Sequence, residues 1–249
     1  MNELSLKNPA GILVKTTCVD FPGLVAGSFF LKGCNLRCPY CYNKVLVTPQ
    51  SEDMELSSVE ELFNHLEKRQ GILSGLVISG GEPLLNPYTP LIIKKAKELG
   101  YKVKLDTNGT LPDELQYFLN NPELCPDFIA IDIKTTAEKY ANIICNKQSK
   151  FYGNTDYFHK IMSETCKIVS KLPTERREFR TVLVPALVSK EEIEEMAAFL
   201  PKDSSWQFAQ FQNKNCLAPE YDKLDPYTDS EIEVIIEEAR RFIPGSQLR

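Results

Sequence analysis

The segment Gly33-Cys34-Asn35-Leu36-Arg37-Cys38-Pro39-Tyr40-Cys41-Tyr42-Asn43-Lys44 places three cysteines within eight residues, at C-x3-C-x2-C spacing. It follows the apolar run Ala26-Gly27-Ser28-Phe29-Phe30-Leu31, which predicts a strand. A strand that leads into such a loop would place three thiolates at the rim of a sheet, where they can bind one metal centre. Structural zinc sites and ordinary iron–sulfur clusters take four protein ligands, so one coordination position would be left for a substrate.

Strand-like and helix-like segments alternate along the rest of the chain. The hydrophobic pattern predicts helices at 57–66, 88–99, 112–120, 155–171, 189–200 and 229–242, and strands at 26–32, 75–79, 101–105, 128–131, 178–184 and 205–211. Such alternation is typical of a parallel sheet with helices outside it. An open doubly wound sheet is the alternative, although no G-x-G-x-x-G motif follows a strand.

The N-terminal segment predicts a hairpin. Residues 11–23 form an apolar, strand-like stretch that ends in the turn Pro22-Gly23, and it would pair with the strand at 26–32. No repeat, low-complexity segment or linker divides the chain. We therefore expect a single domain over residues 1–249, in which residues 1–25 are an N-terminal hairpin extension.

Composition indicates a soluble globular protein of 249 residues, with 43% hydrophobic and 25% charged residues. The formal net charge of −5 and the lack of a basic run argue against nucleic acid as a partner. Neither a signal peptide nor an apolar stretch of about 18 residues is present, so we expect a cytoplasmic protein without a membrane span. The five dispersed cysteines are interpreted as buried or incidental thiols: Cys18, Cys125, Cys145, Cys166 and Cys216.

Polar and glycine motifs follow the ends of several predicted strands, and in a parallel barrel these ends form one rim where active sites are built. Gly80 and Gly81 would allow close approach of a ligand, and the carboxylate of Glu82 can pair with an ammonium group. Arg180 interrupts an apolar strand and needs a partner, because an unpaired buried guanidinium is costly. Simpler interpretations stay open: a plain turn at Gly80-Gly81-Glu82-Pro83, and a structural ion pair at Arg180.

The cysteine loop, with Tyr40 directly before the third cysteine, resembles that of the radical S-adenosylmethionine (SAM) superfamily. The resemblance implies a partial (β/α)6 TIM-like barrel and a [4Fe-4S] cluster held by Cys34, Cys38 and Cys41. The fourth iron of that cluster would bind the amino and carboxylate groups of SAM, which is cleaved reductively to a 5′-deoxyadenosyl radical.

Two further segments narrow the resemblance. Val19-Asp20-Phe21-Pro22-Gly23 resembles the opening signature of glycyl-radical-enzyme activating proteins, and Tyr42-Asn43-Lys44 resembles the activating proteins of anaerobic ribonucleoside-triphosphate reductase. The resemblance implies an enzyme that generates a glycyl radical on a partner, most of all that reductase. A flavodoxin or ferredoxin would supply the electron.

The resemblance also implies individual roles around SAM. Gly80-Gly81-Glu82 matches the motif that receives the SAM amino group. Asp106-Thr107-Asn108-Gly109 and Asp132-Ile133-Lys134 match segments of pyruvate formate-lyase activating enzyme, in which two aspartates hold a monovalent cation and a lysine pairs with the SAM carboxylate. Gln212 stands where that enzyme has a histidine. The expected cofactor-binding residues are Tyr40, Gly80, Gly81, Glu82, Asp106, Thr107, Asp132, Lys134 and Arg180.

Three alternatives stay open at this point. The chain could be an activating enzyme of the pyruvate formate-lyase type, or a radical SAM enzyme that acts on a small molecule, such as 7-carboxy-7-deazaguanine synthase. A non-catalytic zinc or iron–sulfur binding module would use the same cysteines without SAM chemistry. Iron and sulfide content, measured against zinc, distinguishes this last class from the other two.

Overall fold

The computed structural model of the protein describes residues 4–48 and 56–249. The chain forms two compact units, which are described separately. The first unit consists of Met1–Asn35, Val45–Thr107 and Asp113–Ile129, and the second of Leu36–Lys44, Asn108–Pro112 and Ala130–Arg249.

The first unit is built on strands in the order β3-β1-β2-β4-β5. Strands β1 (Pro9–Thr17) and β2 (Ala26–Leu31) are antiparallel, whereas β2, β4 (Gly75–Gly80) and β5 (Lys102–Thr107) run parallel to one another. The apolar residues of β4 are fully buried, as expected for a parallel strand that is covered on both faces. The other elements of this unit are β3 (Ser57–Ser58), α2 (Val59–Lys68), η1 (Pro83–Leu85) and α3 (Thr89–Glu98), together with α1 (Lys44–Val47) and α4 (Pro112–Asn120), whose first residues belong to the second unit.

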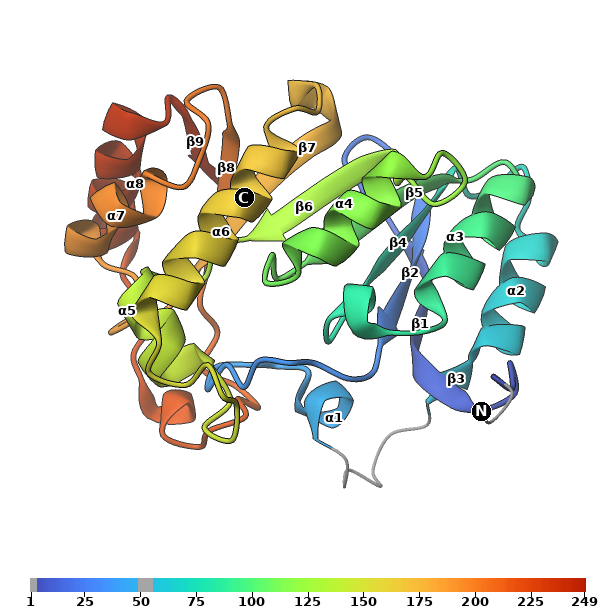
Figure 1. Cartoon of the computed structure of the whole chain (residues 1–249), viewed down its shortest axis with the longest axis horizontal. Helices are drawn as coiled ribbons and strands as arrows, with labels where there is room; N and C mark the ends of the chain where they lie inside the picture. The colour runs from blue at the N-terminus through green and yellow to red at the C-terminus, as the bar shows by residue number, and fades with distance from the viewer. Residues whose placement is uncertain (1–3, 49–55) are drawn as a thin grey trace. The chain divides into compact units, whose positions relative to one another are not determined.

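Helix α2 shows how local sequence sets an element of this unit. Ser58 accepts a hydrogen bond from Glu61 N, and the Glu61 side chain accepts one from Ser58 N, so a capping box fixes the start of the helix. Val59, Leu62 and Leu66 recur at helical spacing and are buried. Helices α2 and α3 lie side by side against the strands of this unit (Figure 1).

The second unit contains strands in the order β6-β7-β8-β9. Strands β7 (Arg177–Leu183), β8 (Ser205–Gln210) and β9 (Gly245–Leu248) are parallel, and β6 (Phe128–Asp132) begins in the first unit. Buried aromatic side chains fill its core, among them Phe179, Trp206 and Phe208. The remaining elements are α5 (Ala137–Lys139), the π-helical turn η2 (Tyr140–Ile144), α6 (Thr155–Val169), η3 (Thr174–Arg176), η4 (Lys190–Glu192), α7 (Ile193–Ala197), η5 (Tyr221–Lys223) and α8 (Asp229–Phe242).

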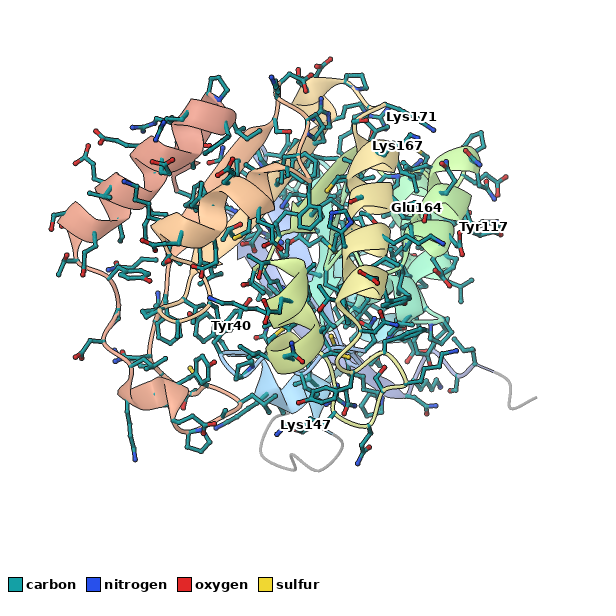
Figure 2. The ribbon with its side chains drawn as sticks, turned by 60° about the vertical axis from the view of Figure 1, so that its left-hand side comes forward. Tyr40, Tyr117, Lys147, Glu164, Lys167 and Lys171 are labelled. Atoms are coloured by element: carbon teal, nitrogen blue, oxygen red, sulfur yellow. The ribbon has the colours of Figure 1, made fainter. Side chains whose placement is uncertain are left out.

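Helix α6 separates an apolar face from a charged one. Its buried residues include Phe158, Met162 and Val169, which recur at helical spacing. Glu164 and Lys167 lie on its exposed side, as Figure 2 shows. This charged side is an ordinary solvated helix surface.

The predicted α/β class with a mostly parallel sheet is confirmed, as is the N-terminal hairpin. The helix predicted at 189–200 is wrong in extent, because η4 and the five-residue helix α7 occupy this segment. The elements α1, β3, α5, η2 and β9 were not predicted. The single domain over 1–249 stays a prediction. Within the described residues, no helix is long and apolar enough to cross a membrane.

Candidate active site

In the first unit, the Gly80-Gly81-Glu82 segment packs against the start of the cysteine loop. Gly81 N donates to Leu31 O and Glu82 N donates to Gly33 O, both at 2.8 Å. A Cβ atom on Gly81 would lie 2.0 Å from Gly33 O, and Gly80 has a φ of +115°. Both positions therefore require glycine. The glycines give room to the backbone that precedes Cys34, and the ligand contact expected for Gly80 and Gly81 stays a prediction.

The carboxylate of Glu82 is fully buried and held by two donors. Thr107 Oγ1 and Leu84 N donate to Glu82 Oε1 at 2.7 and 3.0 Å. Two predicted site residues, Glu82 from the end of β4 and Thr107 from the end of β5, are thus brought into contact. A buried carboxylate at these strand ends can accept hydrogen bonds from the ammonium group of a ligand.

Asp106 has a partner that the sequence analysis did not predict. Lys104, two residues earlier on β5, is completely buried, and its Nζ lies 2.8 Å from Asp106 Oδ1. The same Nζ lies 5.8 Å from the centre of the Phe128 ring. The sequence gives only a weak signal for this pair, because Lys102 and Lys104 both alternate with apolar residues on β5, and only burial distinguishes Lys104 from the exposed Lys102.

In the second unit, backbone hydrogen bonds fix the part of the cysteine loop that carries Cys38 and Cys41. Arg37 N donates to Ile144 O at 2.9 Å, and Ala218 N donates to Pro39 O at 2.8 Å. Cys41 N donates to Cys38 O at 3.0 Å, which closes a tight turn between the two cysteines. The backbone of the loop is thus hydrogen-bonded both within itself and to two other segments, which holds it in one conformation.

The aromatic residue after the third cysteine adds another anchor. The Tyr42 ring stacks on Phe211 at 6.4 Å between centroids, and its hydroxyl accepts a hydrogen bond from Gln212 N at 2.8 Å. Gln212, which replaces the histidine of the family pattern, therefore contacts the cysteine loop through its backbone. Cys216 is buried nearby. Its burial is the main cause, and the Asp222 carboxylate a smaller one, of a thiol pKa raised to about 11.

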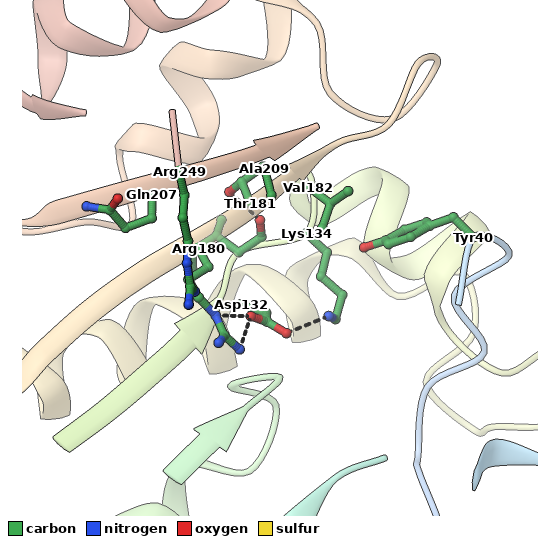
Figure 3. A pocket seen from close by; sticks show the side chains of 10 residues that line it. Tyr40, Asp132, Lys134, Arg180, Thr181, Val182, Gln207, Ala209 and Arg249 are labelled. Carbon is green, nitrogen blue, oxygen red and sulfur yellow. Dashed lines mark hydrogen bonds and ion pairs between the residues drawn. The ribbon is translucent and has the colours of Figure 1, made fainter. Parts of the chain in front are cut away.

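A pocket of about 240 Å³ opens next to this loop in the second unit. Tyr40, Asp132, Lys134 and Arg180, all predicted site residues, line it (Figure 3). Ile133, between Asp132 and Lys134, also lines the pocket. The remaining lining residues were not predicted and come from β7, β8 and the residue after β9: Thr181, Val182, Gln207, Ala209 and Arg249. These positions carry no local motif, so only the packing of the strands identifies them.

Charge pairing dominates the pocket. Asp132 Oδ1 lies 2.9 Å from Arg180 Nε and 2.8 Å from Arg180 Nη2, and its Oδ2 lies 3.1 Å from Lys134 Nζ. Burial alone would raise the pKa of Asp132, but the charges of Arg180 and Lys134 hold it well below its usual range. Burial would likewise lower the pKa of Lys134, yet the Asp132 carboxylate keeps it above its usual value.

All three of these groups are therefore charged near neutral pH. Among the side chains that line the pocket, the three cations Lys134, Arg180 and Arg249 outnumber the one carboxylate, Asp132. The volume of the pocket is smaller than the roughly 300–1,000 Å³ of most ligand pockets, so it suits one anionic group of a larger ligand.

Two buried tyrosines lie close to these charges: Tyr40, which lines the pocket, and Tyr140, which contacts the backbone of Asp132 and Lys134. Burial is the largest cause of the raised pKa values of Tyr40 and Tyr140, so both remain neutral phenols. The Tyr140 hydroxyl accepts from Lys134 N at 2.9 Å and donates to Asp132 O at 3.1 Å. Tyr140 lies in the π-helical turn η2, a type of element that is frequent at functional sites. It fixes the segment that carries Asp132 and Lys134.

The cysteines fit an iron–sulfur cluster by the chemistry of their donors. All eight cysteines are free thiols, and Cys34, Cys38 and Cys41 are partly exposed, as ligands of an added cluster must be. Cys34 belongs to the first unit, and Cys38 and Cys41 to the second. Among the described residues, no three His, Cys, Asp or Glu side chains form a site for a single metal ion.

Comparison with known proteins identifies relatives that match between 39% and 95% of this chain. A glycyl-radical enzyme activating enzyme of Methanocaldococcus jannaschii, named as putative and designated MJ1227, is 30% identical over 95% of this chain and 94% of its own length. Pyruvate formate-lyase-activating enzyme of Clostridium pasteurianum is 31% identical over 72% of this chain and 70% of its own. 7-Carboxy-7-deazaguanine synthase of Aquifex aeolicus is 37% identical, but over only 39% of this chain and 42% of its own.

A family model gives the assignment directly. The model of the radical SAM superfamily matches residues 28–200, which include the cysteine loop and every other predicted site residue. The match covers well over half of the chain, and it agrees with the donor set and with the parallel α/β architecture. The protein therefore belongs to the radical SAM superfamily.

Proposed function

We propose that the protein is a glycyl-radical-enzyme activating enzyme whose partner is an anaerobic ribonucleoside-triphosphate reductase. Superfamily membership implies a [4Fe-4S] cluster and SAM. When bound, these supply the chemistry: one electron from the reduced cluster splits SAM into methionine and a 5′-deoxyadenosyl radical, which takes a hydrogen atom from the target. The protein's own residues bind SAM, orient it and exclude water.

The observation that carries the proposal is the position of Tyr40. It stands between Cys38 and Cys41 in the sequence, and its side chain lines the cationic pocket. An anionic group that binds Lys134 and Arg180 in this pocket would therefore lie beside the cluster loop. The carboxylate of SAM has the required charge and size, and Lys134 would pair with it.

Glu82, in the first unit, has the negative charge that an ammonium group needs as a partner. Its buried carboxylate, oriented by Thr107 and Leu84, would accept the SAM amino group. Gly80 and Gly81 act indirectly, because they let Glu82 N reach Gly33 O beside Cys34.

The partner is argued from similarity along the whole chain. The MJ1227 protein matches 95% of the sequence, and its name specifies a glycyl radical enzyme as the partner class. The Tyr42-Asn43-Lys44 segment favours anaerobic ribonucleotide reductase over pyruvate formate-lyase. Flavodoxin or ferredoxin as electron donor and a cytoplasmic location stay predictions.

Electron paramagnetic resonance tests the proposal. The anaerobically reconstituted protein is reduced and mixed with SAM and an anaerobic ribonucleotide reductase, and 5′-deoxyadenosine is assayed in the same sample. We expect a glycyl radical signal on the reductase that disappears with Cys34→Ser, Cys38→Ser or Cys41→Ser. Cys18→Ser is the matched control, because Cys18 is exposed and lies outside the loop. Reconstituted protein that holds an iron–sulfur cluster but never cleaves SAM would refute the proposal.

A small-molecule substrate is the second candidate. The match to 7-carboxy-7-deazaguanine synthase supports it, although it covers 39% of this chain. This candidate predicts 5′-deoxyadenosine formation that depends on a small cyclic substrate and not on a partner protein.

A different partner protein is a separate outcome. If pyruvate formate-lyase acquires the glycyl radical and the reductase does not, the activating function stands and the partner changes.

A further inference from the structure

Lys104 is a fully buried lysine for which the proposed chemistry has no use. Lys104 lies at the centre of β5 and pairs in register with Val77 of β4. Residues two apart on a strand share a face, so the side chains of Lys104 and Asp106 point to the same side of the sheet. A fully buried ammonium is costly unless an opposite charge compensates it. Here Asp106 provides that charge at 2.8 Å.

The ammonium of Lys104 lies against Asp106 Oδ1, the position that a cation bound to this oxygen would take. A monovalent metal ion would need the Asp106 carboxylate as an oxygen ligand, together with other oxygens around it. Lys104 Nζ already lies within hydrogen-bonding distance of Oδ1, and the Phe128 ring faces the same ammonium. The Asp106 side chain is 9% exposed and that of Lys104 is not exposed at all.

The second carboxylate expected to hold the cation is also compensated. Arg180 donates to Asp132 Oδ1, and Lys134 donates to Oδ2. Asp132 with these two cations has a formal charge of +1, and Asp106 with Lys104 has a formal charge of zero. An added metal ion at Asp132 would therefore meet a surplus of positive charge. The residues present do not fit a bound monovalent cation.

We propose that Lys104 is a built-in cation, whose ammonium replaces a monovalent metal ion at Asp106. The protein then needs neither sodium nor potassium to stabilise this part of the fold. We also expect SAM binding to need neither sodium nor potassium, and this expectation for SAM rests on the proposed function.

Thermal unfolding of the full chain tests the replacement. The melting temperature is measured in choline, sodium, potassium and ammonium chloride at one ionic strength. For the wild-type protein we expect the same value in all four salts, to within about 1 °C. A saturable rise in potassium or sodium over choline would show that a metal ion binds the native state, and it would overturn the proposal.

Two variants of Lys104 give the complementary result. Lys104→Ala removes the charge and opens space beside Asp106, and we expect its melting temperature in choline to fall by about 6–20 °C. Potassium or ammonium should restore part of this loss with saturation, because either ion can enter the space. Lys104→Met removes the charge but fills the space, so neither ion should restore it. Equal behaviour of both variants in all salts would contradict the proposal.

Lys102→Ala is the matched control on the same strand. Lys102 pairs with Asp127 at 2.9 Å, but its side chain is 64% exposed. Its removal should leave the melting temperature near the wild-type value in every salt. If Lys104→Ala does not fold, the wild-type salt comparison still decides the question, and so does the double variant Lys104→Met/Asp106→Asn, which should be insensitive to potassium.

SAM binding to the reconstituted protein separates this inference from the proposed function. We expect the same dissociation constant in choline and in potassium for the wild-type protein. A dissociation constant at least tenfold lower in potassium would overturn the built-in cation. Absence of SAM binding in every salt would instead refute the proposed function, and the melting temperatures would still decide the role of Lys104.

Discussion

Gly81→Ala probes the contact between the Gly80-Gly81-Glu82 segment and the start of the cysteine loop. The added Cβ would lie 2.0 Å from Gly33 O and 2.6 Å from Gly33 C. Since real Cβ contacts stay above 3.0 Å, the two backbones must separate by at least about 1 Å. This movement would stretch the 2.8 Å hydrogen bond from Glu82 N to Gly33 O beyond hydrogen-bonding distance.

The expected loss of stability follows from these contacts. The bonds from Glu82 N to Gly33 O and from Gly81 N to Leu31 O are each worth about 0.5–1.5 kcal/mol. Crowding in a packed interior adds about 1–3 kcal/mol. The free energy of unfolding should therefore fall by about 2–6 kcal/mol.

Urea titration of the full chain, followed by far-ultraviolet circular dichroism, measures this change. Gly27→Ala is the matched control, because Gly27 is also a strand glycine of the first unit and its Cβ would find no atom closer than 3.7 Å. It should change the free energy of unfolding by about 1 kcal/mol or less. If the two variants lose the same stability, the close approach at Gly33 is not the reason that position 81 is glycine.

Three further variants test the second unit and helix α2. Arg180 and Lys134 hold the pKa of Asp132 below its usual range, so its charge stabilises the fold above about pH 4, and this contribution fades as the pH falls toward the folded-state pKa. The difference in melting temperature between the wild type and Asp132→Asn should therefore be constant down to about pH 4 and shrink between about pH 4 and about pH 2. A difference that stays constant over this lower range would contradict the pairing. Tyr140→Phe removes the hydrogen bonds to Lys134 N and Asp132 O, while the ring stacking on Phe158 remains. Urea titration should show that the free energy of unfolding falls by about 1–3 kcal/mol, and an unchanged midpoint would refute this role of Tyr140. Ser58→Ala removes the cap of α2 and should cost about 0.5–2 kcal/mol by the same assay, whereas Ser57→Ala should cost little; equal losses would argue against the capping box.

Elements with a strong periodic pattern were predicted correctly, and weakly patterned ones were missed. Strand β4 is a continuous apolar run, and α2 combines a capping box with apolar residues at helical spacing. Strand β9 has the sequence Gly-Ser-Gln-Leu, which has no strand periodicity, and it forms because β8 supplies hydrogen-bonding partners along its edge. The π-helical turn η2 was likewise hidden, because tertiary contacts of Tyr140 and Ile144 stabilise it.

The site was predicted to the extent that its residues form local motifs. The cysteine spacing, the Gly-Gly-Glu turn and the Asp-Ile-Lys segment are each contiguous in sequence. Gln207 and Arg249 could not be found in this way, because each lines the pocket only through the order of the strands. The partner of Arg180 was also undetermined, since several carboxylates follow predicted strands.

The sequence by itself determined which functional groups are present and the class of the fold. It has three thiols at cluster spacing, carboxylates and cations after predicted strands, and an alternating α/β pattern. These features depend on residues near one another along the chain. Only the tertiary structure decided which charges compensate each other, because ion pairing depends on burial and, for Arg180 and Asp132, on the distance between β7 and β6. It assigned Asp132 to Arg180 and Lys134, and it gave Asp106 to Lys104. Burial makes these pairings energetically decisive, since a charge removed from water must find its partner within the protein.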